Sequence, residues 1–208
     1  MSWFKTLSDT YDNIVKQGDK KLLPIAHSTQ NAHIEITLNT DSEIIYAELV
    51  DHESAPTIIP VTEASASRSS GVAPHALCDK LQYIAGDFEH FTDKKGEKHF
   101  QAYMNQLKSW KDSDYANNKL NIIYNYLSKR KLITDLVDYK ILSLDENNKL
   151  TEKFESSEKK LSAGNQIDSF VRFRVNESNN TPDAIWEDDN LINSYVNYYL
   201  SKEGINKL

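Results

Sequence analysis

Four side chains between positions 90 and 99 are of the types that metal-dependent hydrolysis uses. His90, Asp93, Glu97 and His99 flank the segment Lys94-Lys95-Gly96. Imidazole and carboxylate groups bind hard and borderline cations, so the cluster is a candidate metal site. A solvated turn before a helix contains the same residue types, and base rates favour the turn by roughly four to one. We therefore predict that no metal is bound here.

Cys78 is the second candidate for chemistry, because His75 lies three residues before it and thiolate–histidine pairs act as nucleophiles. A lone cysteine is more often a small buried hydrophobe, by about five to one. The chain contains no Gly-x-Ser-x-Gly, Walker or His-Glu-x-x-His motif. We predict no catalytic residue and no cofactor, and we expect that the chain is not an enzyme.

Two polar segments have side chains that suit nucleic acid. Residues 28–31 follow Ala26-His27 and are predicted to lie in a loop, where their hydroxyls and amides can reach base edges or phosphate oxygens. Residues 65–71 combine small hydroxyl side chains and a glycine with Arg68, which can enter a groove. Two ordinary hydrophilic loops remain the alternative, by about three to one on composition. In that alternative Arg68 pairs with a surface carboxylate such as Glu63.

The charge of the chain limits how it can bind DNA. The 208 residues have a net charge of −7, and residues 1–91 contain 6 Lys and Arg against 13 Asp and Glu. A protein that binds DNA unaided normally has a basic surplus, because phosphate neutralisation supplies much of the affinity. If this chain binds DNA, partners must supply most of the positive field.

Hydrophobic spacing predicts an α+β fold, with an antiparallel sheet first and helices after it. Residues 33–38 alternate between apolar and polar side chains, which predicts a half-buried strand. Turn formers separate it from a second strand over residues 44–50, which predicts a hairpin. A third strand is predicted over residues 57–61.

Apolar stripes with a 3.6-residue period predict the helices. Stripes over residues 100–110 and 120–127 are separated by a short polar segment, which predicts an antiparallel helix pair. The other predicted helices begin or end at Ser2, Gly18, Gly86, Thr134 and Asp188-Asp189.

Three segments are expected along the chain. Residues 1–150 form an N-terminal α+β domain, and the polar residues 151–168 form a linker or surface loop. Residues 169–208 begin a following segment, with a strand over 171–175 that places Arg172 and Arg174 on one face, and then a helix. The apolar runs are short and residues 1–5 do not resemble a signal peptide, so a cytoplasmic protein without a membrane span is expected.

Several segments together resemble a known family. They lie in order over nearly the whole chain: residues 1–3, 23–36, 57–63, 68–84, 103–107 and 171–175. The most specific of them is residues 68–84, which begins Arg68-Ser69-Ser70-Gly71. On these segments the chain resembles the N-terminal part of the large subunit of type I-C CRISPR interference (Cascade) complexes. Members of that family are much longer, so a piece of a longer protein, a truncated product and a separate short homologue all remain open.

The resemblance implies a non-catalytic DNA-recognition component. In the family, the large subunit joins the other Cascade subunits and the guide RNA. It reads the protospacer-adjacent motif on double-stranded target DNA and presents a platform to a helicase–nuclease. Guide pairing then supplies sequence specificity, and the protein reads only a short motif. The DNA-binding residues implied are Ser28, Thr29, Gln30 and Asn31 in the first loop and Arg68, Ser69, Ser70 and Gly71 in the second.

Two alternatives to that role remain. The first is a truncated homologue that acts as a decoy of the subunit. The second is a small metal-dependent hydrolase that uses the residues from His90 to His99.

Overall fold

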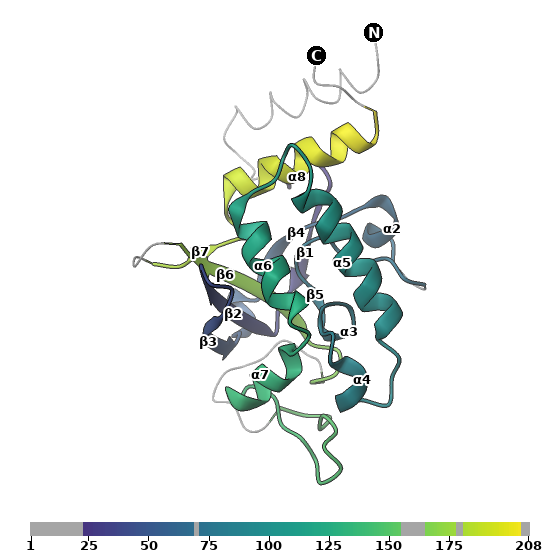
Figure 1. Cartoon of the computed structure of the whole chain (residues 1–208), viewed down its shortest axis with the longest axis vertical. Coiled ribbons are helices and arrows are strands. Elements are labelled where there is room, and N and C mark those ends of the chain that lie inside the picture. The colour runs from purple at the N-terminus through teal and green to yellow at the C-terminus, as the bar shows by residue number, and fades with distance from the viewer. Residues whose placement is uncertain (1–22, 69–70, 155–164, 178–180, 205–208) are drawn as a thin grey trace.

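The computed structural model describes residues 23–68, 71–154, 165–177 and 181–204 (Figure 1). The helix predicted between Ser2 and Gly18 lies outside these ranges. The strands are β1 (His27–Asn31), β2 (Ile34–Asn39), β3 (Ile44–Leu49), β4 (Pro56–Pro60), β5 (Asp79–Lys80), β6 (Phe170–Asn176) and β7 (Asp183–Ala184). The helices are η1 (His52–Ser54), α2 (Glu63–Ala66), α3 (Leu81–Ile84), α4 (Phe88–Phe91), α5 (Glu97–Lys111), α6 (Asn118–Ser128), α7 (Leu132–Asp138) and α8 (Asp189–Lys202).

The predicted α+β class is confirmed, and the larger sheet is mixed. Its strand order is β3-β2-β6-β5, with β7 paired to β6. The predicted hairpin is present as the antiparallel pair of β2 and β3. Strand β6 runs parallel to β2, with Ile34 opposite Val171, so residues far apart in the chain form the centre of one sheet. Strands β1 and β4 form a separate antiparallel sheet.

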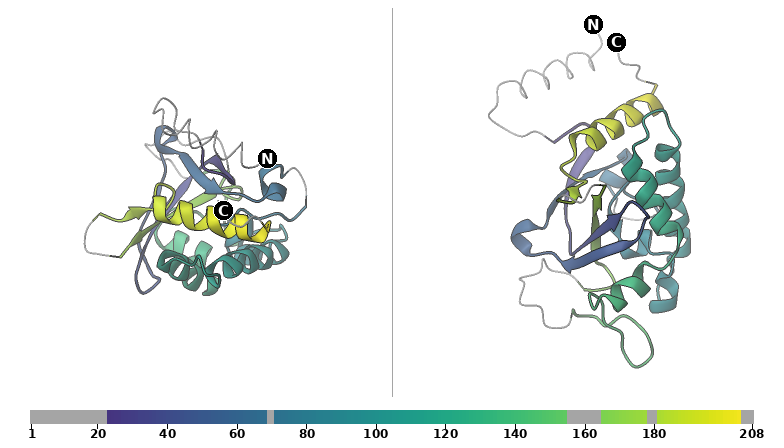
Figure 2. Two further views of the ribbon diagram at one scale, coloured as in Figure 1. Left: turned by 90° about the horizontal axis from the view of Figure 1, so that it is seen from above. Right: turned by 60° about the vertical axis from the view of Figure 1, so that its left-hand side comes forward.

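Strand β2 is buried on both faces, and the prediction of a half-buried strand is wrong. Glu35 and Thr37, expected to face solvent, are only 4% and 3% exposed. The reason is that the sheet is covered twice. Helices α5 and α6 lie on one side of the molecule and strands β1 and β4 on the other (Figure 2).

Helices α5 and α6 lie side by side and pack on the sheet (Figure 1). The stripe predicted on α5 is buried throughout, from Phe100 to Trp110. On α6, Leu120, Ile123 and Leu127 of the predicted stripe are also buried. Both stripes follow the helical period, so the sequence pattern was sufficient here.

Helix α7 begins earlier than predicted. Its N-cap is Lys131, and Thr134 lies inside the helix instead of capping it. The Asp87 carboxylate accepts hydrogen bonds from the backbone N–H groups of Ile133 (3.2 Å) and Thr134 (2.9 Å). A side chain distant in sequence thus satisfies the free N–H groups of the first turn, which is the role expected of a local cap.

The polar stretch before β6 contains one fully buried side chain. Gln166 is 0% exposed, and its amide bonds Ser143, Thr151 and Lys153. The division of the chain at residues 150 and 168 stays a prediction, although β6 lies in the same sheet as β2. In the described ranges, no helix has both the length and the apolar character that crossing a bilayer requires.

Candidate nucleic-acid interface

Residues 28–31 form most of strand β1, and the prediction of a loop at this place is wrong. The strand pairs antiparallel with β4, and Ser28 lies opposite Ile59 and Gln30 opposite Thr57. Ser, Gln and Asn are poor strand formers, but pairing with an apolar partner strand overrides the local preference. We call this two-stranded sheet of β1 and β4 the ribbon.

The polar side chains of the ribbon are available to a ligand. Thr29, Gln30 and Asn31 are exposed, and Ser28 is partly exposed. In the partner strand, Thr57 and Ile59 are fully buried. The ribbon therefore has an apolar strand toward the core and a strand that carries hydroxyl and amide groups at the surface.

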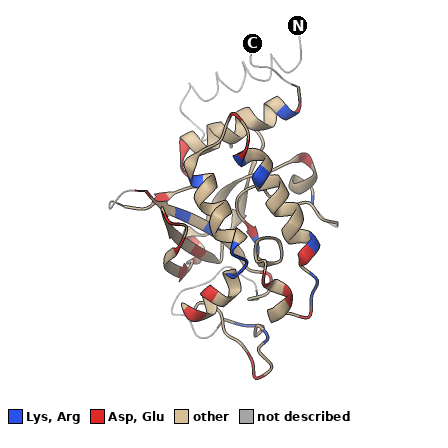
Figure 3. Cartoon of the chain, viewed as in Figure 1, with Lys and Arg blue, Asp and Glu red and all other residues tan. Residues whose placement is uncertain are grey.

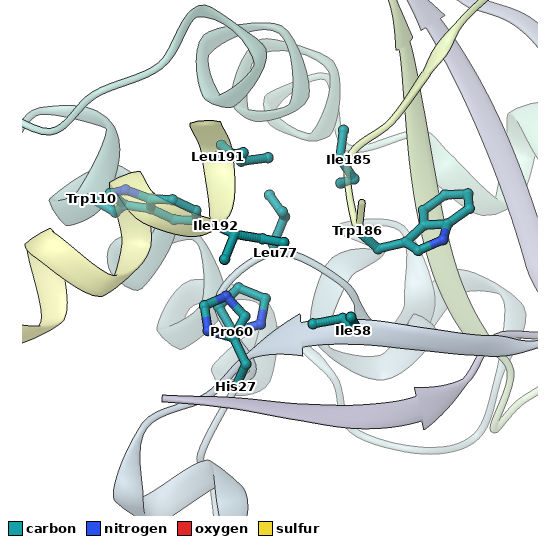
Figure 4. Close-up of a pocket in the computed structure, with 9 residues that line it drawn as sticks. All are labelled: His27, Ile58, Pro60, Leu77, Trp110, Ile185, Trp186, Leu191 and Ile192. Carbon is teal, nitrogen blue, oxygen red and sulfur yellow. The ribbon is translucent and has the colours of Figure 1, made fainter. Parts of the chain in front are cut away.

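An apolar seam fixes the start of the ribbon. His27, Ile58 and Pro60 face Trp110, Trp186 and Leu191 across a gap of only about 10 Å³ (Figure 4). The His27 ring packs edge-on against Tyr195, with 5.5 Å between ring centroids. Burial lowers the pKa of His27, which disfavours an imidazolium charge at this end of the ribbon.

Arg68 is held by a carboxylate within its own fold. Its two terminal nitrogens each donate to the Asp79 carboxylate at 2.9 Å, and one also donates to the Ala73 carbonyl at 3.1 Å. The guanidinium carbon lies 4.4 Å from the centroid of the Tyr83 ring. The side chain of Arg68 is 15% exposed and that of Asp79 0%. The partner suggested by sequence, Glu63, is not the one that the fold uses.

Asp79 is surrounded by donors. Besides Arg68, it accepts hydrogen bonds from the backbone N–H groups of His75 (2.8 Å) and Lys80 (2.8 Å). Burial lowers the pKa of the neighbouring His75 to about 4, against the opposing pull of Asp79. The His75 ring is 4% exposed, and its Nδ1 has no hydrogen-bond partner. Asp79 thus holds Arg68, His75 and Lys80 together.

The two candidate segments meet at one end of the ribbon only. The Ala76 N–H donates to the Pro60 carbonyl at 3.3 Å, and the Val61 N–H donates to Ala26 at 2.8 Å. The Arg68 segment therefore leaves from the end where β1 begins, whereas Asn31 lies at the other end, opposite Pro56. Ser69 and Ser70 lie outside the described residues, and Gly71 has a φ of 82°, a conformation that glycine adopts without strain.

One comparison with known proteins decides the family. The family described as "CRISPR-associated protein (Cas_Csd1)" matches residues 7–207. The chain belongs to the Csd1 family of CRISPR-associated proteins. No curated protein sequence matches the chain.

Two of the four residues that suggested a hydrolase, Asp93 and Glu97, are engaged otherwise in this Csd1-family chain. Glu97 accepts hydrogen bonds from Arg130 and from Gln101. Asp93 lies 3.3 Å from the Lys149 amine. Among the described residues, no group of three or more His, Cys, Asp or Glu side chains could hold a metal ion. The alternative of a metal-dependent hydrolase was based on a cluster of metal ligands that these residues do not form.

Cys78 is a buried core residue, as predicted. It is 0% exposed, and burial raises the pKa of its thiol to about 12. A thiol that stays protonated at neutral pH is a poor nucleophile.

Sequence reasoning missed a buried ionic cluster between the sheet and the ribbon. Arg172 and Arg174 share one face of β6, as predicted, and both donate to the Glu35 carboxylate, Arg172 at 2.7 to 2.8 Å. Both guanidinium groups also lie over the Trp186 ring, at 3.9 and 4.8 Å from its centroid. Arg172 donates further to the Thr57 hydroxyl at 3.2 Å. The cluster thus joins the ribbon to the sheet.

Proposed function

We propose that this chain is the DNA-recognition component of a type I-C CRISPR interference complex, and that its ribbon contacts the target duplex. The family supports the CRISPR association. The ribbon, with exposed hydroxyl and amide side chains at Thr29, Gln30 and Asn31, is the observation that carries the rest. In this proposal the chain reads the protospacer-adjacent motif and catalyses no reaction.

The shape of the ribbon suits duplex DNA. The major groove is about 12 Å wide and admits a two-stranded β-ribbon. Asn and Gln amides there form paired hydrogen bonds with the N6 and N7 groups of adenine, and Thr hydroxyls bond to either base. A surface that offers amides but few cations suits base recognition better than phosphate neutralisation.

The charge around the ribbon supports a division of labour with partners. Asp51 and Glu53 lie at η1, shortly before the Pro56 end of β4, and burial lowers the pKa of His27, which disfavours its charged form. Such a surface gains little from phosphate contacts. In the proposed complex, the other Cascade subunits and the guide RNA hold the DNA, and the ribbon adds discrimination over a short motif.

The segment from Arg68 to Gly71 is a second proposed contact. Because Arg68 pairs with Asp79, its role in this proposal is to hold the following loop beside the start of the ribbon. The serines and glycine of that loop are small enough for backbone N–H groups to approach phosphate closely.

The test is a double substitution in the assembled complex. Gln30→Ala with Asn31→Ala removes both amides from exposed positions. Each paired base contact is worth about 1–3 kcal/mol, so target-duplex binding should weaken by roughly tenfold or more. Assembly with the partner subunits and guide RNA should be unchanged. Asn105→Ala on α5, another exposed amide, is the matched control and should bind as the parent chain does.

Two results would contradict the proposal. One is unchanged duplex affinity of the double variant in a fully assembled complex. The other is a parent chain that assembles with the partners but prevents target binding, which would support the decoy role instead.

A further inference from the structure

A cavity of about 310 Å³ lies between α2, α5 and α8, and none of the candidate DNA-binding residues lines it. Its aromatic wall consists of Tyr195, Tyr198 and Tyr199 on α8. The centroid of the Tyr195 ring lies 6.1 Å from that of Tyr198 and 6.3 Å from that of Tyr199. Tyr195 and Tyr198 are buried and support the wall, whereas Tyr199 is partly exposed and can offer its π-face to a cation or to a planar group.

The aromatic wall already accepts a cation from the chain itself. The Lys202 amine lies 5.7 Å from the centroid of the Tyr198 ring. This distance is within the range of cation–π attraction. The wall is therefore electrostatically suited to positive charge.

Carboxylates from two helices flank the same wall. Glu63 on α2 and Glu203 after α8 are both exposed and line the cavity. After burial, their charges are the causes that raise the pKa of Tyr199, so both act on this tyrosine. Lys202 is the one cation among the described lining residues. Two carboxylates against one ammonium group leave the cavity with negative charge.

The floor of the cavity has an unused donor. Gln106 on α5 contributes to the lining, and its Nε2 group is buried with no hydrogen-bond partner. Buried amide donors are normally satisfied, so this group calls for an acceptor such as a peptide carbonyl.

We propose that this cavity binds an arginine residue of a partner protein. A guanidinium stacks on aromatic faces and donates to carboxylates in a planar fork, which an ammonium group does not. The volume is near the lower limit for small-ligand sites, so it suits one side chain with its adjoining backbone. A nucleotide would bring phosphate to Glu63 and Glu203 and is disfavoured. The proposal is independent of the ribbon and of its role.

The test is a titration of the full chain with a minimal probe, N-acetyl-arginine amide, followed by NMR of isotope-labelled tyrosines. The neutral isostere N-acetyl-citrulline amide is the matched ligand control. We expect saturable shifts of Tyr198 and Tyr199, and at least tenfold weaker binding of the citrulline probe. Glu63→Gln with Glu203→Gln should weaken arginine binding at least tenfold. Glu43→Gln, an exposed carboxylate in the turn between β2 and β3, should leave it unchanged.

A further pair of variants tests the ring. Tyr199→Phe should keep arginine binding, whereas Tyr199→Leu should weaken it severalfold. The proposal is overturned by any of four results: no saturable arginine binding, equal binding of citrulline, insensitivity to the double glutamate change, or tighter binding of a nucleoside monophosphate at the same tyrosines.

Discussion

At the scale of the residue, the sequence and the fold suggest different roles for Arg68. It is the only cation between Lys21 and Lys80, which suggested a free charge for DNA. In the fold, the buried Asp79 carboxylate takes both of its terminal nitrogens, and the Tyr83 ring covers its plane. An arginine paired in this way stabilises the loop first, so any effect on DNA has to be separated from an effect on folding.

Replacing Arg68 by Ala should destabilise the chain by about 3 kcal/mol, because Asp79 would remain buried without its counter-ion. Urea unfolding at pH 7 measures this change. Glu63→Ala is the control, since Glu63 does not pair with Arg68, and it should change the free energy of unfolding by less than about 0.5 kcal/mol. Equal effects of the two substitutions would argue against the pairing. A loss of duplex binding without loss of stability would make Arg68 a direct contact.

His75 should make stability depend on pH. Its folded pKa of about 4 lies below the value of about 6.5 expected in the unfolded chain, so the unfolded state binds more protons between these values. The free energy of unfolding should therefore fall as the pH drops below about 6.5, by about 2 kcal/mol between pH 7 and pH 5. His75→Gln should remove that part of the slope, which denaturant titrations at several pH values would detect. Parallel pH profiles for the two proteins would rule out this role for His75.

At the scale of the element, the sequence predicted what local periodicity encodes. The stripe from Phe100 to Trp110 repeats every three to four residues, and α5 buries it as expected. The β2–β3 hairpin was also predictable, because turn formers separate two apolar runs. These elements can be predicted from residues that are close together in the sequence.

The ribbon and the parallel pair were not predictable in the same way. Strand β1 is a strand because β4 pairs with it, and its own residues have little strand preference. Strand β2 is buried on both faces because helices cover one side of the sheet and the ribbon covers the other, and its buried Glu35 is paired with Arg172 and Arg174, more than a hundred residues later. In both strands the structure depends on residues that are distant in the chain, and a single sequence does not show which distant residues will pair. For the candidate site, sequence thus identified the polar residues 28–31 but assigned them to the wrong kind of element.

At the scale of the whole molecule, four cations of the described residues pair with carboxylates of their own fold. Lys119, which is 7% exposed, forms ion pairs with Asp183 (2.8 Å) and Asp188. Arg172 and Arg174 form ion pairs with Glu35, and Arg68 forms an ion pair with Asp79. Along the chain drawn in Figure 3, basic and acidic positions are interspersed. The net charge of the whole chain is −7.

This charge distribution predicts that the isolated chain binds duplex DNA weakly and with little sequence preference. Non-specific DNA-binding proteins reach dissociation constants of about 10⁻⁴ to 10⁻⁶ M by releasing counterions, and an acidic chain should bind more weakly than about 10⁻⁴ M. The proposed amide contacts of Gln30 and Asn31 add only a few kcal/mol, too little to hold DNA alone. Fluorescence anisotropy with a labelled duplex at physiological salt measures this affinity, and the assembled complex is the positive control. Tight, sequence-selective binding by the isolated chain would show that the affinity comes from its own surface and not from partners.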